Sequence, residues 1–516
     1  RLARELERLG KGRFKRPAWK TTLEFILALT VALILATIIR QSWFELYEIP
    51  TGSMRPTYKE QDRLIVSKTT HGLNVPLQTA HFTFIEDQVK RGNVVIWSGD
   101  GVDLPDTDSS FLGIFPYKKR YIKRLIGKPG DTLYFYGGKV YGIDKDGAPI
   151  RELLDAPYMQ EIETVPFISF EGKPEVQAQN STKELVYKHF NQPVGRVVVN
   201  LFAPEKGEIW NGKEWTNRGA FAQRYGIGNY AMVTLVTQEE GKAPYALLFH
   251  FNPNLNHAGS QLRARKDPLQ TETVLMPLQE NDLKKILANL YTSRFVVENG
   301  KAYAYSGGSG EKRGGIALSG IPDGTYEFDR GVAYQIHMTG VATRLPKEHP
   351  LYRNDPDQIM KLFNYGIRFH PMRGDLQPRF AYYRNGTLYL MGQPFLEKED
   401  PRLKNLSFTD AGEPSKELIE AQGLHIPEGH YLVLGDNHAD SGDSRFFGFV
   451  PEANLQGTPA FTFWPPGKGW GAPKEAATKL LTSPLVIVWI LFLVSLMLWL
   501  AYRHRQLTTP VYRKLK

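Results

Sequence analysis

Two long apolar runs, one near each end of the 516-residue chain, constrain the fold more than any other feature. Residues 23–39 form a run of 17 with one acidic side chain, Glu24, and residues 485–502 form an uncharged run of 18. A helix that spans a bilayer needs about 20 apolar residues, and about 17 is the lower limit. Both runs are therefore predicted to be transmembrane helices. A buried core helix is the alternative for each; a cleaved signal peptide is another for the first, although no small-residue cleavage site follows it.

The net charge of +10 is concentrated outside these runs. Residues 1–20 carry eight Lys or Arg against two Glu, and residues 503–516 carry five Lys or Arg and no acid. Because flanking Lys and Arg favour the cytoplasmic side, both tails are predicted to be cytoplasmic, with residues 41–480 across the membrane. A nucleic-acid-binding protein spreads its cations over a folded face. We therefore expect membrane lipid, and no nucleic acid, among the partners.

The segment between the two runs is predicted to be mainly β. The chain contains 47 Gly and 34 Pro, which favours many turns and short strands over a helical bundle. Runs of β-branched and aromatic residues between turn residues are typical of strands. Such runs lie at residues 94–97, 119–127, 132–137 and 430–436.

A long stretch between these runs has a pattern of its own. Residues 295–306 and 380–392 are aromatic and strand-like, and the second piece contains an Asn-Gly hairpin turn at 385–386. A helix is expected to begin near Asn281, with an apolar stripe that packs into a core. The side chains of that stripe are Leu283, Ile286, Leu287 and Leu290. This stretch is therefore predicted to be β-rich with some α.

Three polar stretches are the candidates for chemistry. Residues 47–57 place Ser53 in a turn, residues 119–131 place Lys123 in a strand, and residues 435–448 form a dense polar loop. Taken alone, each stretch has a simpler interpretation: an ordinary turn serine, a solvated strand lysine, and structural turns with an ion pair. The chain has no cysteine, which excludes disulfides, thiolate catalysis and Cys-ligated metals.

A serine nucleophile needs a base. No His/Asp pairing suggests itself, and no G-x-S-x-G elbow surrounds any serine. A neutral lysine amine serves instead when it is buried, since burial lowers its pKa. On a strand, Lys123 shares a face with Tyr121 and Leu125, so its side chain is a candidate for such burial.

Several separate sequence boxes resemble, in order, those of type I signal peptidase (leader peptidase), and a membrane anchor precedes them. The boxes are IPTGSMRPT, KRGNVVIW, RYIKRLIGKPGD, PEGHYLVLGDN and HADSGDSRFFGFVP, within residues 41–137 and 423–465. The resemblance implies a serine protease with a Ser/Lys dyad. Such a hydrolase removes N-terminal signal peptides from exported preproteins after small residues of the Ala-x-Ala type.

The resemblance also implies a role for each matching residue. Ser53 matches the nucleophile and Lys123 the general base, which requires a pKa lowered by about three units. Thr51 falls where a hydroxyl helps to form the oxyanion hole, together with the Ser53 backbone N–H. Ser441 matches the serine that orients the lysine. The remaining supporting residues of the last boxes are Asp443, Arg445 and Asp436.

The resemblance and the apolar runs together predict the order of segments. These are a basic cytoplasmic segment (1–20), a transmembrane helix (21–40), the first part of a catalytic domain (41–144), an inserted domain (145–420), the second part of the catalytic domain (421–480), a second transmembrane helix (481–502) and a basic cytoplasmic tail (503–516). The insert is longer than expected for the family, and the second span is unusual. The predicted location is the cytoplasmic (inner) membrane, multi-pass, with the catalytic domain on the extracytoplasmic side.

The position of Ser53 fits a substrate at the membrane. From Arg40 to Ser53 the chain reaches at most about 45 Å when fully extended. The nucleophile is therefore tethered near the membrane surface, where the apolar segment of a signal peptide also ends. Signal-peptide-bearing preproteins are the expected substrates, and the protein translocon is a candidate partner.

Two other functions compete with this prediction. One is a catalytically silent homologue that binds or scaffolds export components through the insert. The other is a self-cleaving Ser/Lys peptidase of the repressor type, against which the two apolar runs and the charge distribution argue. The twelve histidines form no H-E-x-x-H motif, so no metal is expected. Gly226 and Gly228 lack the strand–helix context of a nucleotide site, and no cofactor is expected.

Overall fold

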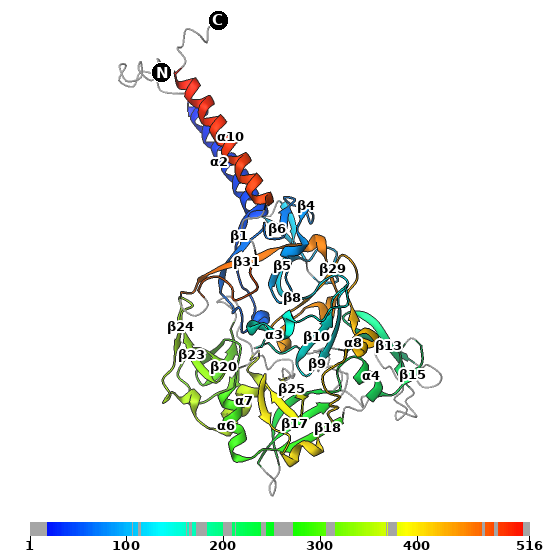
Figure 1. Ribbon diagram of the computed structural model, residues 1–516. Coiled ribbons are helices and arrows are strands. Elements are labelled where there is room, and N and C mark those ends of the chain that lie inside the picture. Colours follow the sequence, from blue (N-terminus) through cyan, green and yellow to red (C-terminus); the bar gives the residue numbers. More distant parts are fainter. Residues whose placement is uncertain are drawn as a thin grey trace.

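The structure is a computed structural model with two long helices and a β-rich body (Figure 1). It describes residues 18–105, 107–111, 115–160, 162–164, 168–171, 183–199, 209–211, 213–238, 244–251, 272–305, 315–367, 369, 379–466, 470–478 and 483–508. The basic tails predicted at 1–20 and 503–516 lie largely outside these residues. The prediction of a mainly β chain is confirmed.

The two long helices leave the same side of the body (Figure 1). They are α2 (Ala18–Ser42) and α10 (Ser483–Thr508). Among the described helices, one segment, Ser483–Arg505, is long and apolar enough to cross a membrane by length and composition; α2 contains a shorter apolar segment, Phe25–Thr37. The rings of Trp43 and Trp489 lie 4.0 Å apart between centroids and connect the bases of the two helices. The prediction of two spans stays a prediction.

A seven-stranded antiparallel sheet forms the centre of the body, and it joins strands from both ends of the chain. Its order is β1 (Phe44–Glu48), β2 (Arg63–Ser67), β31 (Leu455–Trp464), β5 (Val94–Ser98), β8 (Arg120–Gly127), β29 (His430–Leu434) and β30 (Val450–Pro451). The strands predicted at 94–97, 119–127 and 430–436 are thus confirmed within a residue or two at their ends.

Smaller elements surround this sheet. A second sheet is formed by β10 (Lys139–Ile143), β9 (Thr132–Tyr136) and β28 (Leu424–His425). Two hairpins pair β3 (Gly72–Asn74) with β4 (His81–Phe84) and β6 (Asp108–Phe111) with β7 (Phe115–Lys118). The short helices are α3 (Glu152–Asp155), α8 (Lys416–Gln422) and α9 (Ser444–Phe447).

The described part of residues 145–420, the segment predicted to be an insert and called the insert below, forms three further sheets. The first is β18 (Glu272–Pro277), β17 (Tyr245–Phe251), β16 (Tyr230–Thr237), β25 (Arg379–Arg384), β26 (Thr387–Leu390) and β27 (Gln393–Leu396). The second is β21 (Ile316–Ala317), β20 (Lys301–Ala304), β19 (Phe295–Glu298), β22 (Gly324–Asp329), β23 (Val332–Ile336) and β24 (Ala342–Arg344). The third is β11 (Ile168–Glu171), β12 (Lys183–His189), β13 (Gln192–Val199), β14 (Ile209–Trp210) and β15 (Trp215–Thr216). The same segment also contains the helices α4 (Arg218–Arg224), α6 (Glu280–Ala288) and α7 (Pro356–Tyr365).

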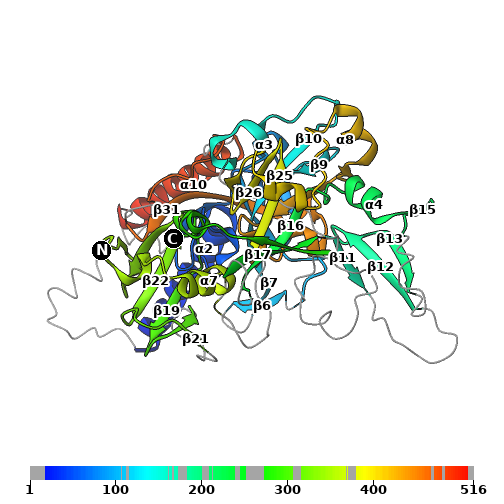
Figure 2. The same cartoon turned by 90° about the horizontal axis from the view of Figure 1, so that it is seen from below.

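The insert has its own apolar core. The largest cluster of buried side chains is drawn entirely from residues 231–406. This core lies at the end of the body opposite the two long helices (Figure 1), and Figure 2 shows from below how its strands spread across that end. The segment therefore satisfies a basic requirement of a domain, since it buries apolar surface within itself.

The local predictions in the insert are confirmed with two adjustments. The hairpin turn at 385–386 joins β25 and β26, and both residues have positive φ. The helix begins at Glu280, because Gln279 and Asp282 form a capping box there. The strand-like piece 295–306 contains a hairpin of two strands, β19 and β20, since Asn299 and Gly300 at positive φ reverse the chain.

Candidate active site

Ser53 lies in a turn that follows the first strand of the central sheet. The turn is the 3-10 helix Gly52–Met54, and the Ser53 side chain is 7% exposed. The Asn437 backbone N–H donates to the Ser53 carbonyl at 3.0 Å, and the Asn437 side-chain amide donates to the Gly52 carbonyl at 3.1 Å. The turn that carries Ser53, called here the nucleophile turn (residues 51–55), is therefore fixed by a loop from the other end of the sequence.

Lys123 faces Ser53 from the middle of the central sheet. It lies on β8 opposite Val95 of β5, and its side chain is 5% exposed. The Lys123 Nζ donates to the Ser53 Oγ at 2.8 Å and to the Ile122 carbonyl at 3.0 Å. Burial lowers the pKa of Lys123 to about 8, although the nearby carboxylates of Asp443 and Asp436 oppose this shift. A neutral amine at this position is able to accept the Ser53 hydroxyl proton.

A second buried lysine shows that a lowered pKa alone does not identify a catalytic base. Lys68 is fully buried, and burial lowers its pKa to about 7, helped by the positive charge of Arg120 and opposed by Glu45. Its Nζ lies 3.1 Å from a Glu45 carboxylate oxygen and donates to the Tyr47 hydroxyl at 3.2 Å. Lys123 differs from Lys68 in its contact with a serine hydroxyl, so the geometry favours Lys123 as the candidate base.

Asp443 and Arg445 form a buried ion pair beneath the site. The Arg445 Nε and Nη2 donate to the two Asp443 carboxylate oxygens at 2.7 and 2.8 Å, and the Gly435 N–H donates to the same carboxylate at 2.9 Å. Burial tends to raise the pKa of Asp443, but Arg445 and these hydrogen bonds outweigh it and hold the pKa below its usual value. The Asp443 carboxylate therefore favours the cationic form of Lys123, and the positive charge of Arg445 opposes it.

Ser441 lies beside the nucleophile turn, but it does not bond to the lysine. Gly435 lies close to both Ser441 and Ser53. A Cβ built on Gly435 would lie 2.1 Å from the Ser441 Oγ and 2.6 Å from the Ser53 carbonyl oxygen. Among the described residues, the Ser441 Oγ makes no hydrogen bond with the Lys123 Nζ, whose second partner is the Ile122 carbonyl. The orienting role of Ser441 stays a prediction.

The Thr51 hydroxyl lies close to the Ser53 hydroxyl. The Thr51 Oγ1 lies 3.4 Å from the Ser53 Oγ, at the exposed edge of the nucleophile turn. A hydroxyl there is able to donate to a developing oxyanion, and its part in an oxyanion hole stays a prediction.

Asp436 has a partner that the sequence analysis missed. The Arg124 Nε and Nη2 donate to the two Asp436 carboxylate oxygens at 2.8 and 2.7 Å, and Nη2 also donates to the Thr57 hydroxyl at 3.0 Å. Arg124 is 1% exposed. Since neighbours on a strand point to opposite faces, Lys123 and Arg124 serve the two sides of one sheet. The adjacent Lys123 and Arg124 in the sequence could have predicted this second buried cation, on the opposite face of the strand.

Two more residues of the site were missed. The sequence predicted no contact for Asn437 beyond its place in a polar loop. It predicted none for Gly435, whose role is to lack a side chain.

No group of His, Cys, Asp or Glu within the described part of the chain has the arrangement of a metal site. The groups gathered here are those of an acyl-transfer site: a serine hydroxyl, an amine of lowered pKa and a hydroxyl donor.

Comparison with known proteins connects these residues to one family. The family model described as "Signal peptidase, peptidase S26" matches residues 22–196 and 381–464, half of the chain. The chain is 35% identical over 127 residues to "Signal peptidase I T" of Bacillus subtilis (strain 168), which is 23% of this chain and 51% of that protein. It is 33% identical over 138 residues to "Signal peptidase I" of Bacillus licheniformis, 27% of this chain and 55% of that protein.

A cyanobacterial relative shows the same extent of match. The chain is 32% identical over 141 residues to "Probable signal peptidase I-1" of Synechocystis sp. (strain ATCC 27184 / PCC 6803 / Kazusa), 27% of this chain and 60% of that protein. The chain spans about half the length of the curated relatives it matches. The matched segments carry both Ser53 and Lys123, and on their extent the chain belongs to the signal peptidase family, peptidase S26.

Proposed function

We propose that this protein is a membrane-bound serine endopeptidase that removes N-terminal signal peptides from exported preproteins by a Ser/Lys dyad. The observation that carries the proposal is the buried Lys123 amine, 2.8 Å from the Ser53 hydroxyl. Family membership supports the same reaction class.

In the proposed mechanism, the Ser53 Oγ attacks the scissile carbonyl carbon while its proton passes to the Lys123 Nζ. The oxyanion that forms receives hydrogen bonds from the Thr51 hydroxyl and the Ser53 N–H. Lys123 then gives its proton to the leaving amine, and the acyl-enzyme remains on Ser53. Water activated by Lys123 hydrolyses this ester and releases the signal peptide.

Burial is what makes Lys123 a useful base in this scheme. An exposed lysine has a pKa near 10.4 and is almost wholly cationic near neutrality. With its pKa lowered to about 8, a measurable fraction of the Lys123 amine is neutral near pH 7. The proposed supporting residues, Asp443 with Arg445 and Asp436 with Arg124, hold the loop and strand that frame the dyad.

We also propose the segment order predicted above, with the catalytic domain at 41–144 and 421–480 and the insert at 145–420. Helices α2 and α10 would anchor the body in the cytoplasmic membrane, with the catalytic domain on the extracytoplasmic side. Their exposed apolar side chains, such as Leu27 and Leu498, support lipid contact. Substrates with small residues of the Ala-x-Ala type and contact with the translocon belong to the same proposal.

The test is cleavage of a preprotein with an Ala-x-Ala site by the detergent-solubilised full chain. Mass determination of the new N-terminus identifies the cut, and Ser53→Ala and Lys123→Met are each expected to abolish it. Cleavage that is unchanged in both variants would reject the dyad. A folded wild-type protein that does not cleave would favour the alternative of a silent, scaffolding homologue.

A further inference from the structure

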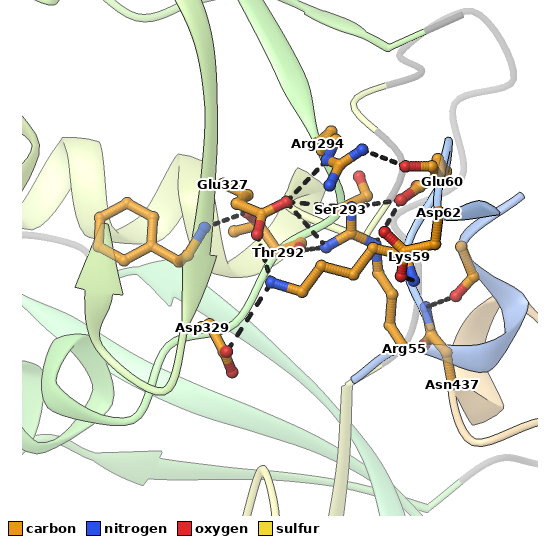
Figure 3. A network of polar contacts seen from close by, with 12 residues as sticks. Arg55, Lys59, Glu60, Asp62, Thr292, Ser293, Arg294, Glu327, Asp329 and Asn437 are labelled. Carbon is orange, nitrogen blue, oxygen red and sulfur yellow. Dashed lines mark hydrogen bonds and ion pairs between the residues drawn. The ribbon is translucent and has the colours of Figure 1, made fainter. Parts of the chain in front are cut away.

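The insert reaches the nucleophile turn through a network of buried and half-buried charges, shown in Figure 3. We call this network the insert clamp. Its members are Arg55, Lys59 and Glu60 from the catalytic side, and Arg294 and Glu327 from the insert. The dyad mechanism uses none of these residues, and none of them belongs to the site predicted from the sequence.

Glu327 is the centre of the clamp. It lies on β22 of the second insert sheet, and its side chain is 0% exposed. Its carboxylate pairs with the Arg294 Nε at 2.9 Å, with the Arg55 Nη2 at 3.4 Å and with the Lys59 Nζ. Burial tends to raise the pKa of Glu327, but the three cations outweigh it and the pKa lies well below its usual range. One insert carboxylate therefore holds two cations of the catalytic side.

The clamp continues to the residue that precedes Ser53. The Arg55 Nε donates to a Glu60 carboxylate oxygen at 2.8 Å, and the Arg55 Nη1 donates to the Thr292 carbonyl at 3.2 Å. A Cβ on Gly52 would lie 2.8 Å from the other Glu60 oxygen, so the Glu60 carboxylate packs against the turn. Arg55 itself is only two residues after Ser53. A shift of Glu327 would thus be passed to the nucleophile through Arg55 and Glu60.

Apolar packing does not fill this junction. A cavity of about 60 Å³ lies between the insert and the catalytic side. Its lining is mixed, with Arg55 and Lys59 beside Tyr291, Phe328 and Met391. Because packing leaves this space open, the ion pairs of Glu327 add a constraint across the junction.

We propose that Glu327 is a positioning residue for the hydrolysis proposed above, and that it fixes the nucleophile turn through Arg55 and, by way of Arg55, through Glu60. The inference rests on the proposed function and assigns the insert a role in it. The insert would thereby complete the active site of this chain, in addition to any docking role. Displacement of a reacting group by about 1 Å is able to cost about a hundredfold in rate, so small losses of position are measurable.

The test compares Glu327→Gln with Asp282→Asn in the solubilised full chain. Asp282 is a matched control, because it is 2% exposed, lies in the insert and pairs with the Arg402 Nη1 at 2.5 Å, but makes no contact with the clamp. Cleavage of the Ala-x-Ala preprotein is followed below the unfolding temperature of each variant. We expect kcat of Glu327→Gln to fall about tenfold to a hundredfold with KM nearly unchanged. Asp282→Asn should keep the wild-type kcat.

Two further variants, Glu327→Asp and Arg294→Lys, change the same contact in other ways. Glu327→Asp retains the charge on a shorter side chain, and its kcat should lie between those of the wild type and Glu327→Gln. If Glu327→Gln does not fold, Arg294→Lys probes the same contact, because a lysine cannot repeat the forked donation of Arg294 to Glu327 and to the Glu60 carbonyl. It should lower kcat several-fold.

Wild-type kcat in folded Glu327→Gln, or in Arg294→Lys where that variant replaces it, would overturn the inference, as would an equal loss of kcat in Asp282→Asn. A wild-type protein without cleavage activity, or undiminished cleavage by Ser53→Ala, would instead overturn the proposed function and this inference with it.

Discussion

The two sides of the nucleophile turn are held by different means. On one side, the loop that begins at Gly435 contacts the turn through directional hydrogen bonds from Asn437 to backbone carbonyls. On the other side, the insert contacts the turn through the ion pair of Glu327 with Arg55. Hydrogen bonds to backbone fix individual atoms, whereas ion pairs act over longer distances and tolerate a partly open junction. The comparison indicates that the loop side sets the geometry of the dyad and the insert side restrains the segment that carries it.

The largest expected effect is on the loop side, at the buried pair of Asp443 and Arg445. Asp443→Asn removes the charge that compensates Arg445, and both side chains are at most 1% exposed. Loss of one partner of a buried pair costs about 3–5 kcal/mol. We expect the free energy of unfolding to fall by that amount in chemical denaturation.

The control for this change is the exposed pair of Lys361 and Asp357 on α7, with a distance of 2.6 Å. Asp357→Asn should change the free energy of unfolding by less than about 1 kcal/mol. A similarly small effect of Asp443→Asn would mean that the loop side does not depend on its buried pair.

The next effect concerns pH and the dyad itself. In the proposed mechanism only the neutral amine of Lys123 acts as a base, and burial lowers the pKa of Lys123 to about 8. Activity should therefore be fully present above this pKa and be lost as the pH falls through it. Below pH 8 we expect kcat/KM to drop about tenfold per pH unit, which a pH profile of preprotein cleavage measures.

The same profile for Glu327→Gln sharpens the comparison of the two sides. Its kcat/KM should be lower at every pH, with the inflection near the wild-type value, because the clamp positions Ser53 without facing Lys123. A profile that is flat from pH 6 to 9 in the wild type would show that Lys123 is not the titrating base.

A smaller effect is expected at Gly435. A Cβ there would lie 2.1 Å from the Ser441 Oγ and 2.6 Å from the Ser53 carbonyl oxygen. Gly435→Ala forces the loop away from the nucleophile turn, which should cost about 1–3 kcal/mol of stability and lower kcat. Gly442→Ala in the same loop is the matched control, because a Cβ on Gly442 meets no atom within 4 Å. Equal stability and activity of the two variants would contradict the close approach.

The smallest effect is expected at Asn437. Asn437→Ala removes one side-chain donor to the Gly52 carbonyl, which should cost about 1 kcal/mol in stability and a few-fold in kcat. Asn454→Ala also removes buried hydrogen bonds, from its amide to the Ser98 and Asp100 carbonyls, but away from the dyad. The control should lose stability and keep its kcat. A loss of kcat in both variants would indicate a general effect of destabilisation.

Sequence patterns predicted the elements that depend on local chemistry. The strands at 94–97 and 119–127 follow from their apolar and β-branched residues, and the turn at 385–386 follows from the freedom of Asn-Gly at positive φ. The juxtaposition of Ser53 and Lys123 was predicted from a family resemblance. Periodicity alone gave no distance between them, because register in a sheet of strands from both ends of the chain is set by tertiary contacts.

No sequence pattern predicted the contacts between the insert and the nucleophile turn. Glu327 and Lys59 are separated by 268 positions, and a lone glutamate on a strand is most often solvated. The orienting role of Ser441 stays a prediction from the family resemblance; in the structure the Lys123 Nζ donates to the Ser53 Oγ and to the Ile122 carbonyl. Contacts between distant segments depend on where strands end and loops cross, which local sequence does not encode.

The sequence by itself determined the β-rich class, the apolar segments near both ends and the identity of the nucleophile and base as candidates. The class and the apolar segments follow from composition and periodicity, which act over a few residues, and the candidate nucleophile and base follow from motifs that resemble those of one family. Only the tertiary structure decided that Arg124 pairs with Asp436, that Asn437 holds the turn and that Glu327 reaches it from the insert. Charges and hydrogen bonds between distant segments gain their strength from burial, and burial exists only once the whole chain has folded.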